Sequence, residues 1–257
     1  MTGPWPVAKP IIRACGLHKF FGAAHIVKGV DLDIMPGEVV VIIGPSGGGK
    51  STFLRCLNFL ETPSAGTVEI DGIEIEAGEP ARQRRKHIQE IRQKVVMVFQ
   101  DYRLFPHMTV LDNLIVGPVT VKRTPRHQAM VRAEELLAWT DLSARRDDYP
   151  AQLSVGQQKQ LEIGRALSVD PRILFFDDPT SGLDPEFTAE VIDAMERLAG
   201  EGRTMVVVSH ELRFARNVAD LVLLMDGGVW VEMGPPEELF TQPREDRTRR
   251  FLARIRR

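Results

Sequence analysis

Residues 44–52 have the sequence Gly44-Pro45-Ser46-Gly47-Gly48-Gly49-Lys50-Ser51-Thr52. They follow the apolar run Val39–Ile43 and precede a segment whose apolar residues recur at helical spacing. A strand, a glycine-rich loop and a helix with the spacing G-x-x-x-x-G-K-[ST] are typical of a loop that binds nucleotide phosphates. The glycines allow consecutive N–H groups to point into one concavity, and the helix N-terminus adds positive potential. We expect Lys50 to contact the β- and γ-phosphates and the Ser51 hydroxyl to bind Mg²⁺.

The bulk composition is that of an ordinary globular protein. The chain has 257 residues, of which 43% are hydrophobic and 26% charged, enough for one large domain. Its net charge of −2 gives no overall field that would favour DNA or anionic lipid. Cys15 and Cys56 form no disulfide framework, which fits a reducing compartment. Met1–Pro10 is interrupted by prolines and is not expected to be a signal peptide, and no apolar run approaches the roughly 20 residues of a membrane span. We therefore expect a cytosolic protein, or one attached to a membrane only through a partner.

The N-terminal part is predicted to combine an antiparallel sheet with the strand that enters the phosphate loop. Ile11–Leu17 is predicted to be a strand, followed by a loop over His18–Gly22. Apolar and acidic residues alternate along Val30–Ile34, as in a strand that is buried on one face. The dipeptide Asp71-Gly72 predicts a hairpin within Thr67–Ile75.

The region from Gln100 to Ala166 is predicted to be helical. Thr109–Asp112 has capping-box spacing and begins a helix that we expect to stop at Gly117-Pro118. Thr124-Pro125 opens a second helix, and a third is expected from Ser154 to about Leu167. This block would be inserted between two strands of the core sheet.

After this block the chain returns to alternating strands and helices. The predicted strands are Ile173–Phe176, Thr204–Val208 and Leu221–Met225, with a helix over Glu186–Ala199 and a hairpin at Asp226-Gly227.

Two segments are strongly basic. Glu79–Lys94 lacks interleaved aromatics, so a solvated helix is favoured over a nucleic-acid patch, and we expect no nucleic-acid partner. Arg244–Arg257 holds seven arginines and is predicted to be an amphipathic surface helix.

Six elements occur in one order along the chain: Gly44–Thr52, Gln100, Leu153–Gln157, Ile173–Asp178, Ser181–Asp184 and His210. In this order they resemble the ATPase subunits of ATP-binding cassette (ABC) transporters over nearly the whole length. Phe99–Leu114 and His210–Phe240 look most like the cassettes of bacterial polar amino acid importers. The resemblance implies an α/β fold, in which a P-loop NTPase core with a RecA-like sheet carries an antiparallel β subdomain and an inserted helical subdomain. We expect a single ABC ATPase domain with parts at 11–99, 100–167, 168–240 and a basic tail at 241–257.

Several acidic and polar residues are assigned to the chemistry. Asp177 ends an apolar strand and suits a carboxylate that holds Mg²⁺ directly or through water, although an acidic turn residue is the alternative interpretation. The resemblance implies that Asp178 is the general base that orients the attacking water. Gln100, at the end of a neighbouring strand, would touch metal and water and, in the family, reports to the membrane partner. His210 follows a strand, where ligands lie in such sheets, and the resemblance implies that it contacts the γ-phosphate. Phe21 matches the aromatic residue that stacks on adenine, whereas Phe20 is expected to be core.

The family resemblance also implies a dimer. Ser154 occupies the position of a helix N-cap, and the helix behind it would direct its positive end at an anion. In the family this anion is the γ-phosphate of ATP bound by the other subunit. ATP would then lie between Gly44–Thr52 of one subunit and Ser154, Gly156 and Gln157 of the other, in a head-to-tail, ATP-dependent homodimer. Asp184 would lie across the same interface.

Three positions depart from the family pattern. Val155 replaces the first glycine of L-S-G-G-Q, and Gln160 stands where arginine is usual. Valine is poorly suited if the backbone needs a positive φ or a close approach to phosphate, and tolerable if only its N–H matters. Asp178 replaces glutamate, so the carboxylate is withdrawn by roughly 1 Å, a displacement that can reduce a rate on the order of 100-fold. Our hypothesis is slow hydrolysis that Asp178→Glu and Val155→Gly would accelerate.

The leading interpretation is the energy-coupling subunit of a membrane importer for amino acids or related polar solutes, using ATP and Mg²⁺. It would act at the cytoplasmic face of the inner or plasma membrane, bound to transmembrane permease subunits and, through them, to a solute-binding protein. One alternative is a hydrolysis-impaired cassette that acts as an ATP-binding switch. Another is a soluble, non-transport ABC ATPase, although such proteins usually carry tandem cassettes or long coiled coils, and neither is present here.

Overall fold

The computed structural model describes residues 9–255, which fall into two compact units. Unit 1 contains residues 9–92 and 202–255, and unit 2 contains residues 93–201. Most of the Met1–Pro10 segment, which we expect not to be a signal peptide, lies outside the described residues, as do Arg256 and Arg257 of the basic tail. The four subdomain boundaries expected from the sequence stay a prediction.

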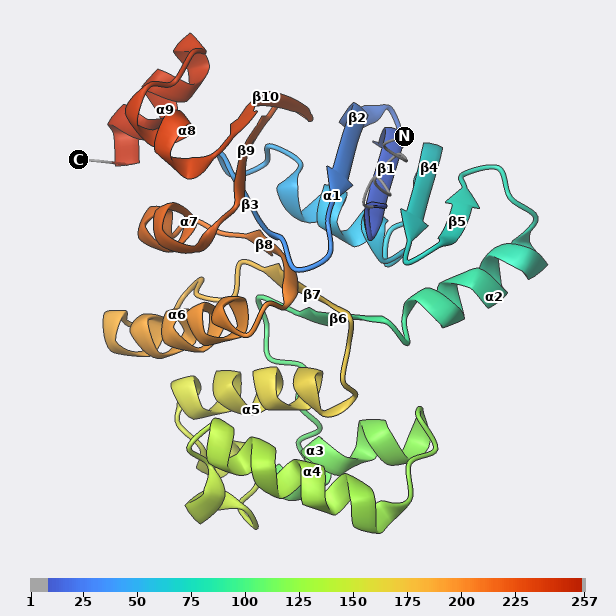
Figure 1. Cartoon of the computed structure of the whole chain (residues 1–257), viewed down its shortest axis with the longest axis vertical. Coiled ribbons are helices and arrows are strands. Elements are labelled where there is room, and N and C mark those ends of the chain that lie inside the picture. Colours follow the sequence, from blue (N-terminus) through green and yellow to red (C-terminus); the bar gives the residue numbers. More distant parts are fainter. Residues whose placement is uncertain (1–8, 256–257) are drawn as a thin grey trace, which may run out of the picture. The chain divides into compact units, whose positions relative to one another are not determined.

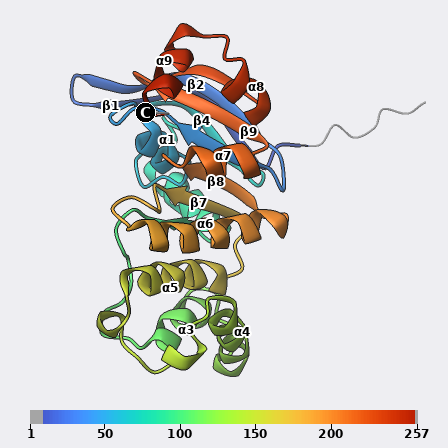
Figure 2. The same cartoon turned by 90° about the vertical axis from the view of Figure 1, so that its left-hand side faces the viewer.

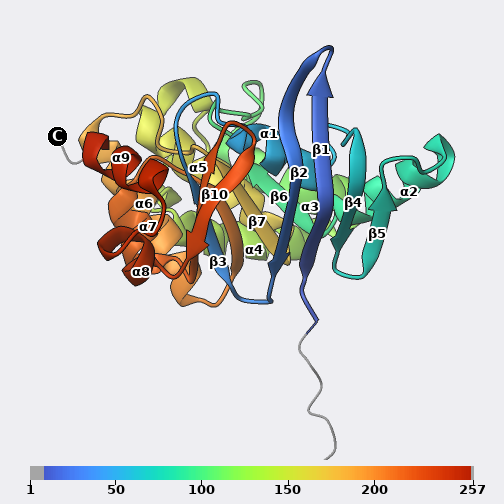
Figure 3. The same cartoon turned by 90° about the horizontal axis from the view of Figure 1, so that it is seen from above.

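Unit 1 holds an antiparallel sheet with the strand order β2-β1-β4-β5 (Figure 3). The strands are β1 (Ile12–Phe21), β2 (Ala24–Ile34), β4 (Ala65–Ile70) and β5 (Ile73–Glu76). The predicted hairpin is confirmed, because Ile70 pairs with Ile73 and both turn residues, Asp71 and Gly72, have positive φ. The basic segment after β5 forms helix α2 (Ala81–Ile91), of which only Ile91 is buried.

The predicted loop over His18–Gly22 is wrong. Strand β1 continues to Phe21, which pairs with Ala24 across a tight turn at Gly22. Phe20 is also not a core residue, since 43% of it is exposed. Its ring stacks on that of His25 on the paired strand, with 3.9 Å between the ring centroids. Cross-strand pairing therefore orders this segment without burying it.

The parallel strands of unit 1 place the phosphate loop. Strand β3 (Val39–Ile43) lies between β8 (Thr204–Val208) and β9 (Leu221–Asp226), parallel to both. All five residues of β3 are buried, as expected for a strand covered on both faces. Helix α1 (Lys50–Leu57) follows the loop, and α7 (Leu212–Val218) connects β8 to β9. The predicted hairpin after Asp226 is confirmed by the pairing of Asp226 with Val229 on β10 (Val229–Gly234).

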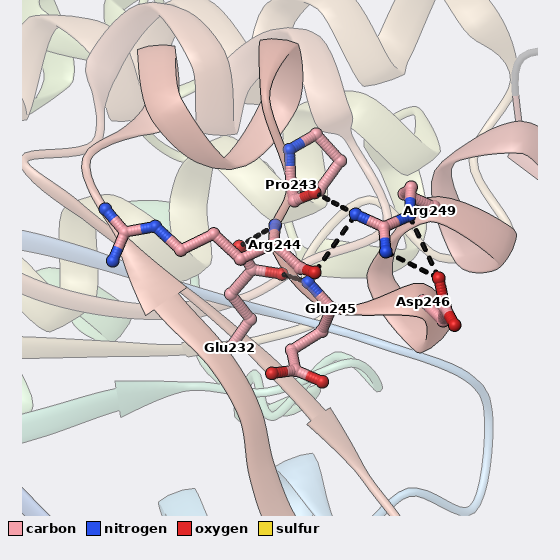
Figure 4. A network of polar contacts seen from close by, with 6 residues as sticks. All are labelled: Glu232, Pro243, Arg244, Glu245, Asp246 and Arg249. Carbon is pink, nitrogen blue, oxygen red and sulfur yellow. Dashed lines mark hydrogen bonds and ion pairs between the residues drawn. The ribbon is translucent and has the colours of Figure 1, made fainter.

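The C-terminal helices are held to β10 by polar contacts. Helix α8 (Pro236–Thr241) is followed by Arg244 and Glu245. Their backbone N–H groups donate hydrogen bonds to the carboxylate of Glu232 on β10, at 2.8 and 3.1 Å (Figure 4). Helix α9 (Asp246–Ile255) follows, and Arg249 binds Asp246 within it (Figure 4). The predicted terminal helix is confirmed over these residues.

Unit 2 combines two parallel strands with helices. Strands β6 (Val95–Val98) and β7 (Ile173–Asp177) pair in register from Val95 and Ile173. Helices α3 (Val110–Thr120), α4 (Arg126–Trp139) and α5 (Val155–Ser168) pack on one another, and α5 also contacts α6 (Pro185–Gly200) (Figures 1 and 2). Two short 3₁₀ turns, Ser143–Arg145 and Pro150–Gln152, lie between α4 and α5.

The three predicted helices of this region are confirmed, with one correction. Thr109 caps α3 by accepting from the Asp112 N–H, but α3 does not stop at Gly117-Pro118. It continues to Thr120, because the buried Pro118 removes one backbone donor while Val121 N–H still donates to Gly117. The α/β class predicted from the sequence is confirmed. No helix within residues 9–255 has the length and apolar character needed to cross a bilayer.

Candidate nucleotide-binding site

The glycine-rich loop is packed tightly against its neighbours in unit 1. Gly44 has a φ of 143°, and a Cβ atom there would overlap the carbonyl oxygen of Met225 on β9. A Cβ on Gly48 would lie 2.9 Å from the same oxygen. Gly49 is the N-cap of α1 with a φ of 102°. Glycine is therefore required at these positions by backbone conformation and by close approach.

Lys50 is held inside this loop. Only 6% of the residue is exposed, and its ammonium donates to the carbonyl oxygens of Gly44 and Pro45 at 2.8 and 2.9 Å. The charge therefore lies within the curl of the loop, where a phosphate would meet it. Cys56 lies further along the same helix, α1. Burial raises the pKa of its thiol to about 12, so this thiol stays protonated near neutral pH.

Phe21 lines the same groove as the phosphate loop. The groove is formed by Phe21, Ile26 and residues 47–52. Phe21 is 47% exposed, and the Lys19 ammonium lies 4.6 Å from its ring centroid. Lys19 is itself fixed by Glu61 and by the Thr62 carbonyl, each at 2.9 Å. The ring is thus oriented by one neighbour and accessible to a planar group such as a base.

His210 lies at the same sheet edge as the phosphate loop. It comes two residues after β8, whose last residue, Val208, pairs with Ile42 of β3. Ser209 is fully buried, and its N–H donates to Ile42 while its hydroxyl accepts from the Glu211 N–H. His210 is exposed. Unit 1 thus carries the phosphate loop, Phe21 and His210 of the predicted site.

Unit 2 brings the predicted acidic residues near Gln100. Asp177 ends β7 and is 1% exposed, and Gln100 follows the parallel neighbour β6 by two residues. The Gln100 amide donates to the Ser181 hydroxyl at 3.1 Å, and the Ser181 N–H donates to the Asp178 carbonyl. Asp178 has a φ of 49°, in the left-handed region that aspartate enters more readily than glutamate. Backbone in this region is common at functional sites.

Helix α5 begins with a complete capping box. The Ser154 hydroxyl accepts from the Gln157 N–H at 3.2 Å, and the Gln157 amide oxygen accepts from the Ser154 N–H at 3.0 Å. Gly156 has no room for a side chain, because a Cβ there would overlap the Phe187 ring on α6. Asp184 is the exposed N-cap residue of α6.

Comparison with known proteins identifies the family. The family model described as "ABC transporter" matches residues 27–181, more than half of the chain. The chain belongs to the ABC transporter family. It is 48% identical over 244 residues to the L-cystine transport system ATP-binding protein TcyN of Escherichia coli K12, covering 95% of this chain and 98% of that protein. It is also 48% identical to the L-cystine import ATP-binding protein TcyC of Bacillus subtilis, covering 93% and 96%.

Solved structures agree with this assignment. The chain resembles the dimeric structure of a post-hydrolysis state of the ATP-binding cassette MJ0796 bound to ADP and Pi, with a TM-score of 0.76 and 30% identity. The match covers 88% of this chain and 98% of that chain. This chain is therefore an ABC-type ATPase, and the predicted ATP-binding function is confirmed.

The oxygen donors of this ABC ATPase fit Mg²⁺ bound together with nucleotide. No cluster of three or more His, Cys, Asp or Glu side chains that would hold a metal occurs within residues 9–255. Mg²⁺ keeps several waters and binds through one or two carboxylates together with substrate phosphates, so no such cluster is needed. Unit 1 contains the Ser51 hydroxyl as an oxygen donor of this kind. Unit 2, taken by itself, contains the Asp177 carboxylate and the Gln100 amide oxygen. Because the Gln100 nitrogen donates to Ser181, its oxygen is the end available to a metal or to water.

The family departures are accommodated locally in the structure. Val155 lies in the first turn of α5 with helical backbone, and 41% of it is exposed. A positive φ is therefore not needed there, and valine meets the backbone requirement. Gln160, in the place of arginine, donates to the Glu190 carbonyl on α6 at 3.1 Å.

Sequence reasoning gave no role to Lys159, the residue before Gln160. The structure buries Lys159 completely, together with Glu162. The pattern that could have found it is its helical spacing from Gly156 and Ile163, which places the lysine in the buried stripe of α5.

Proposed function

We propose that this chain is the ATP-binding and hydrolysing subunit of a membrane importer for amino acids or related polar solutes. The observation that carries the proposal is the identity to cystine-transport ATP-binding proteins over almost the entire chain. Relatives named for glutamine and arginine transport are 46% identical over similar lengths. The solute differs among these relatives, so the proposal commits to the class of polar amino acids.

The proposed mechanism divides the work between the units. In unit 1, Lys50 and the N–H groups of the phosphate loop bind the phosphates, Phe21 stacks on adenine, and His210 contacts the γ-phosphate. In unit 2, Asp177 and Gln100 supply oxygen ligands, and Asp178 orients the water that attacks in line. Bound Mg²⁺ would neutralise charge that develops on the transferred phosphate.

The proposed assembly is an ATP-dependent homodimer bound to two permease subunits. Support comes from the dimeric structures of a similar bacterial cassette and from the capped N-terminus of α5, which offers N–H groups to an anion. Ser154, Gly156, Gln157 and Asp184 would face the ATP of the opposite subunit. We place the assembly at the cytoplasmic face of the membrane, attached through the permease.

Reconstitution tests the proposal directly. The chain is co-expressed with a candidate permease of the same organism and purified from membranes, and the complex is placed in proteoliposomes with a solute-binding protein. We expect ATP-driven uptake of one polar amino acid among cystine, glutamine, arginine and glutamate, and none of maltose. A complex with Lys50→Ala serves as the matched control. Failure to co-purify with a permease, or equal uptake with the Lys50→Ala complex, would contradict the proposal.

One observation keeps the ATP-binding switch as a second candidate. The Asp178 carboxylate is one methylene shorter than that of glutamate, and its backbone lies in the left-handed region, which aspartate enters more readily than glutamate. Single-turnover hydrolysis separates the two candidates. A switch would bind ATP and dimerise while converting less than one ATP per dimer over many minutes.

A further inference from the structure

A buried ion pair joins helix α5 to the segment that carries Gln100. Lys159 is fully buried and Glu162 is 2% exposed, and the Lys159 ammonium donates to Glu162 Oε2 at 2.8 Å. The two side chains of this pair lie one turn apart on α5 and are shielded from water, unlike the surface ion pairs of the molecule. A buried pair contributes little net stability, but removing one partner alone leaves an uncompensated charge.

The remaining donors of Lys159 bind the backbone around Gln100. The ammonium donates to the Phe99 carbonyl at 2.8 Å and to the Gln100 carbonyl at 3.3 Å. With Glu162, these acceptors use all three N–H groups of the ammonium. The Tyr102 ring covers the same ammonium, whose nitrogen is 4.8 Å from the ring centroid. We name Lys159, Glu162, Tyr102 and the carbonyls of Phe99 and Gln100 the Lys159 cluster.

The ion pair is the buried part of the cluster, and the Tyr102 ring lies at its surface. Tyr102 is 36% exposed, and partial burial together with the negative charge of Glu162 raises its pKa. The second carboxylate oxygen of Glu162, Oε1, is buried and accepts no hydrogen bond from the described residues. Glu162 and the two carbonyls are therefore the polar partners that the Lys159 ammonium has inside the protein.

We propose that Lys159 is a positioning residue that acts through Gln100. By holding the Gln100 carbonyl against α5, it sets the point from which the Gln100 side chain reaches Ser181 and the Asp178 turn. The same helix begins at Ser154, five residues before Lys159, so Gln100 and the capped end of α5 move together. This inference rests on the role proposed above for Gln100 in hydrolysis.

A double-variant cycle tests the inference. Lys159→Met/Glu162→Met removes both charges at similar volume, so it leaves no buried charge uncompensated. We expect its kcat in steady-state ATP hydrolysis to fall about 10-fold, with the KM for ATP changed by less than about 2-fold. In a Gln100→Ala background the same pair of substitutions should lower kcat by no more than about 2-fold further, because the residue it positions is gone.

The control and the outcomes separate this inference from the proposed function. Arg132→Met/Glu135→Met removes an exposed pair with the same spacing on α4 and should leave kcat unchanged. Folding is checked by circular dichroism and thermal unfolding, and Lys159→Gln/Glu162→Gln replaces the methionine variant if that variant does not fold. The inference is wrong if the folded double variant has the kcat of the wild type. It is also wrong if the double variant and Gln100→Ala lower kcat independently, so that their fold-changes multiply. Neither outcome affects the proposed function. If Gln100→Ala itself leaves kcat unchanged, the role proposed for Gln100 is wrong and the inference is lost with it.

Discussion

The phosphate loop and the N-terminal half of α5 are the two regions that we propose to bind anions, and they are built in different ways. In the loop, backbone conformation and close approach leave no space for side chains at Gly44, Gly48 and Gly49, and the sequence keeps the common nucleotide-binding pattern. At the start of α5, side chains form the capping box and the Lys159 cluster, and the sequence departs from the family pattern at Val155 and Gln160.

This contrast indicates which regions of a nucleotide-binding protein can accept amino-acid substitutions. A region that binds through backbone N–H groups is restricted to residues that permit its conformation. A region held by side chains can exchange one set of contacts for another, provided that buried polar groups remain paired. The predictions below test whether the loop is the rigid region and α5 the adaptable one.

The largest effect is expected for Lys50→Ala in the loop. The substitution removes a charged donor to the phosphates, so the Kd for ATP should rise on the order of 100-fold. Isothermal titration calorimetry measures the affinity, and light scattering with ATP measures self-association. Lys86→Ala on the exposed face of α2 is the control and should change neither quantity. Unchanged affinity and unchanged self-association with Lys50→Ala would remove the basis of the proposed site.

Asp178→Glu should change the rate in the opposite direction. The longer carboxylate reaches closer to the attacking water, so steady-state ATPase activity should rise on the order of 10-fold. Glutamate enters the left-handed backbone conformation of this position less readily than aspartate. The substitution should therefore also lower the free energy of unfolding by up to about 1 kcal/mol. Asp178→Asn keeps the length and removes the charge, and its ATPase activity should fall. An unchanged rate with glutamate would show that the shorter side chain does not limit hydrolysis.

Gly156→Ala tests whether α5 has one position as restricted as the loop. The added methyl group meets Phe187 on α6, so the free energy of unfolding should fall by about 1–3 kcal/mol. Gly200→Ala at the end of α6 has open space around its Cβ position and is the matched control, expected to be neutral or slightly stabilising. Urea unfolding measures both. Equal stability of the two variants would mean that α5 and α6 move apart at Phe187 at little cost, so that Gly156 is not a restricted position.

Val155→Gly should have a small effect. The residue already has helical backbone, so glycine gains nothing in conformation and costs about 0.5–1 kcal/mol of stability. We expect the ATPase rate to change by less than about 2-fold. A several-fold increase would instead show that the exposed valine side chain obstructs the approach of an anion, as the sequence alone suggested.

Much of the fold was predictable because the deciding residues act locally. The phosphate loop, the hairpin at Asp71-Gly72 and the helix starts at Thr109 and Ser154 each depend on a few adjacent residues. The errors arose where pairing or packing with another element overrides the preference of the segment itself. Strand β1 extends to Phe21 because β2 pairs with it, and α3 passes Pro118 because that residue is buried among its neighbours.

The candidate site was predictable residue by residue but not in its supporting contacts. Motif spacing identified Lys50, Asp177 and Ser154, whose chemistry is evident from residue type. The burial of Lys159 was not evident, since a lysine and a glutamate three residues apart on a helix usually form an exposed pair. Apart from its helical spacing from Gly156 and Ile163, only its contacts with the carbonyls of Phe99 and Gln100 distinguish this lysine.

The contacts of Glu232 have a consequence for the protein in mild acid. Burial of this carboxylate works to raise its pKa, but the Thr248 hydroxyl, the N–H groups of Arg244 and Glu245 and the positive charge of Arg244 together hold the pKa below its usual value of 4.5. Its stabilising contribution is therefore present above that pH and is lost as the pH falls through the lower value in the folded protein. Arg247 of α9 also binds Asp226, so on acidification we expect α9 to loosen at its start, with hydrogen exchange quickening over Asp246–Ile255 before it does in β10. Equal exchange in α9 and β10 would mean that this carboxylate does not anchor the end of the chain.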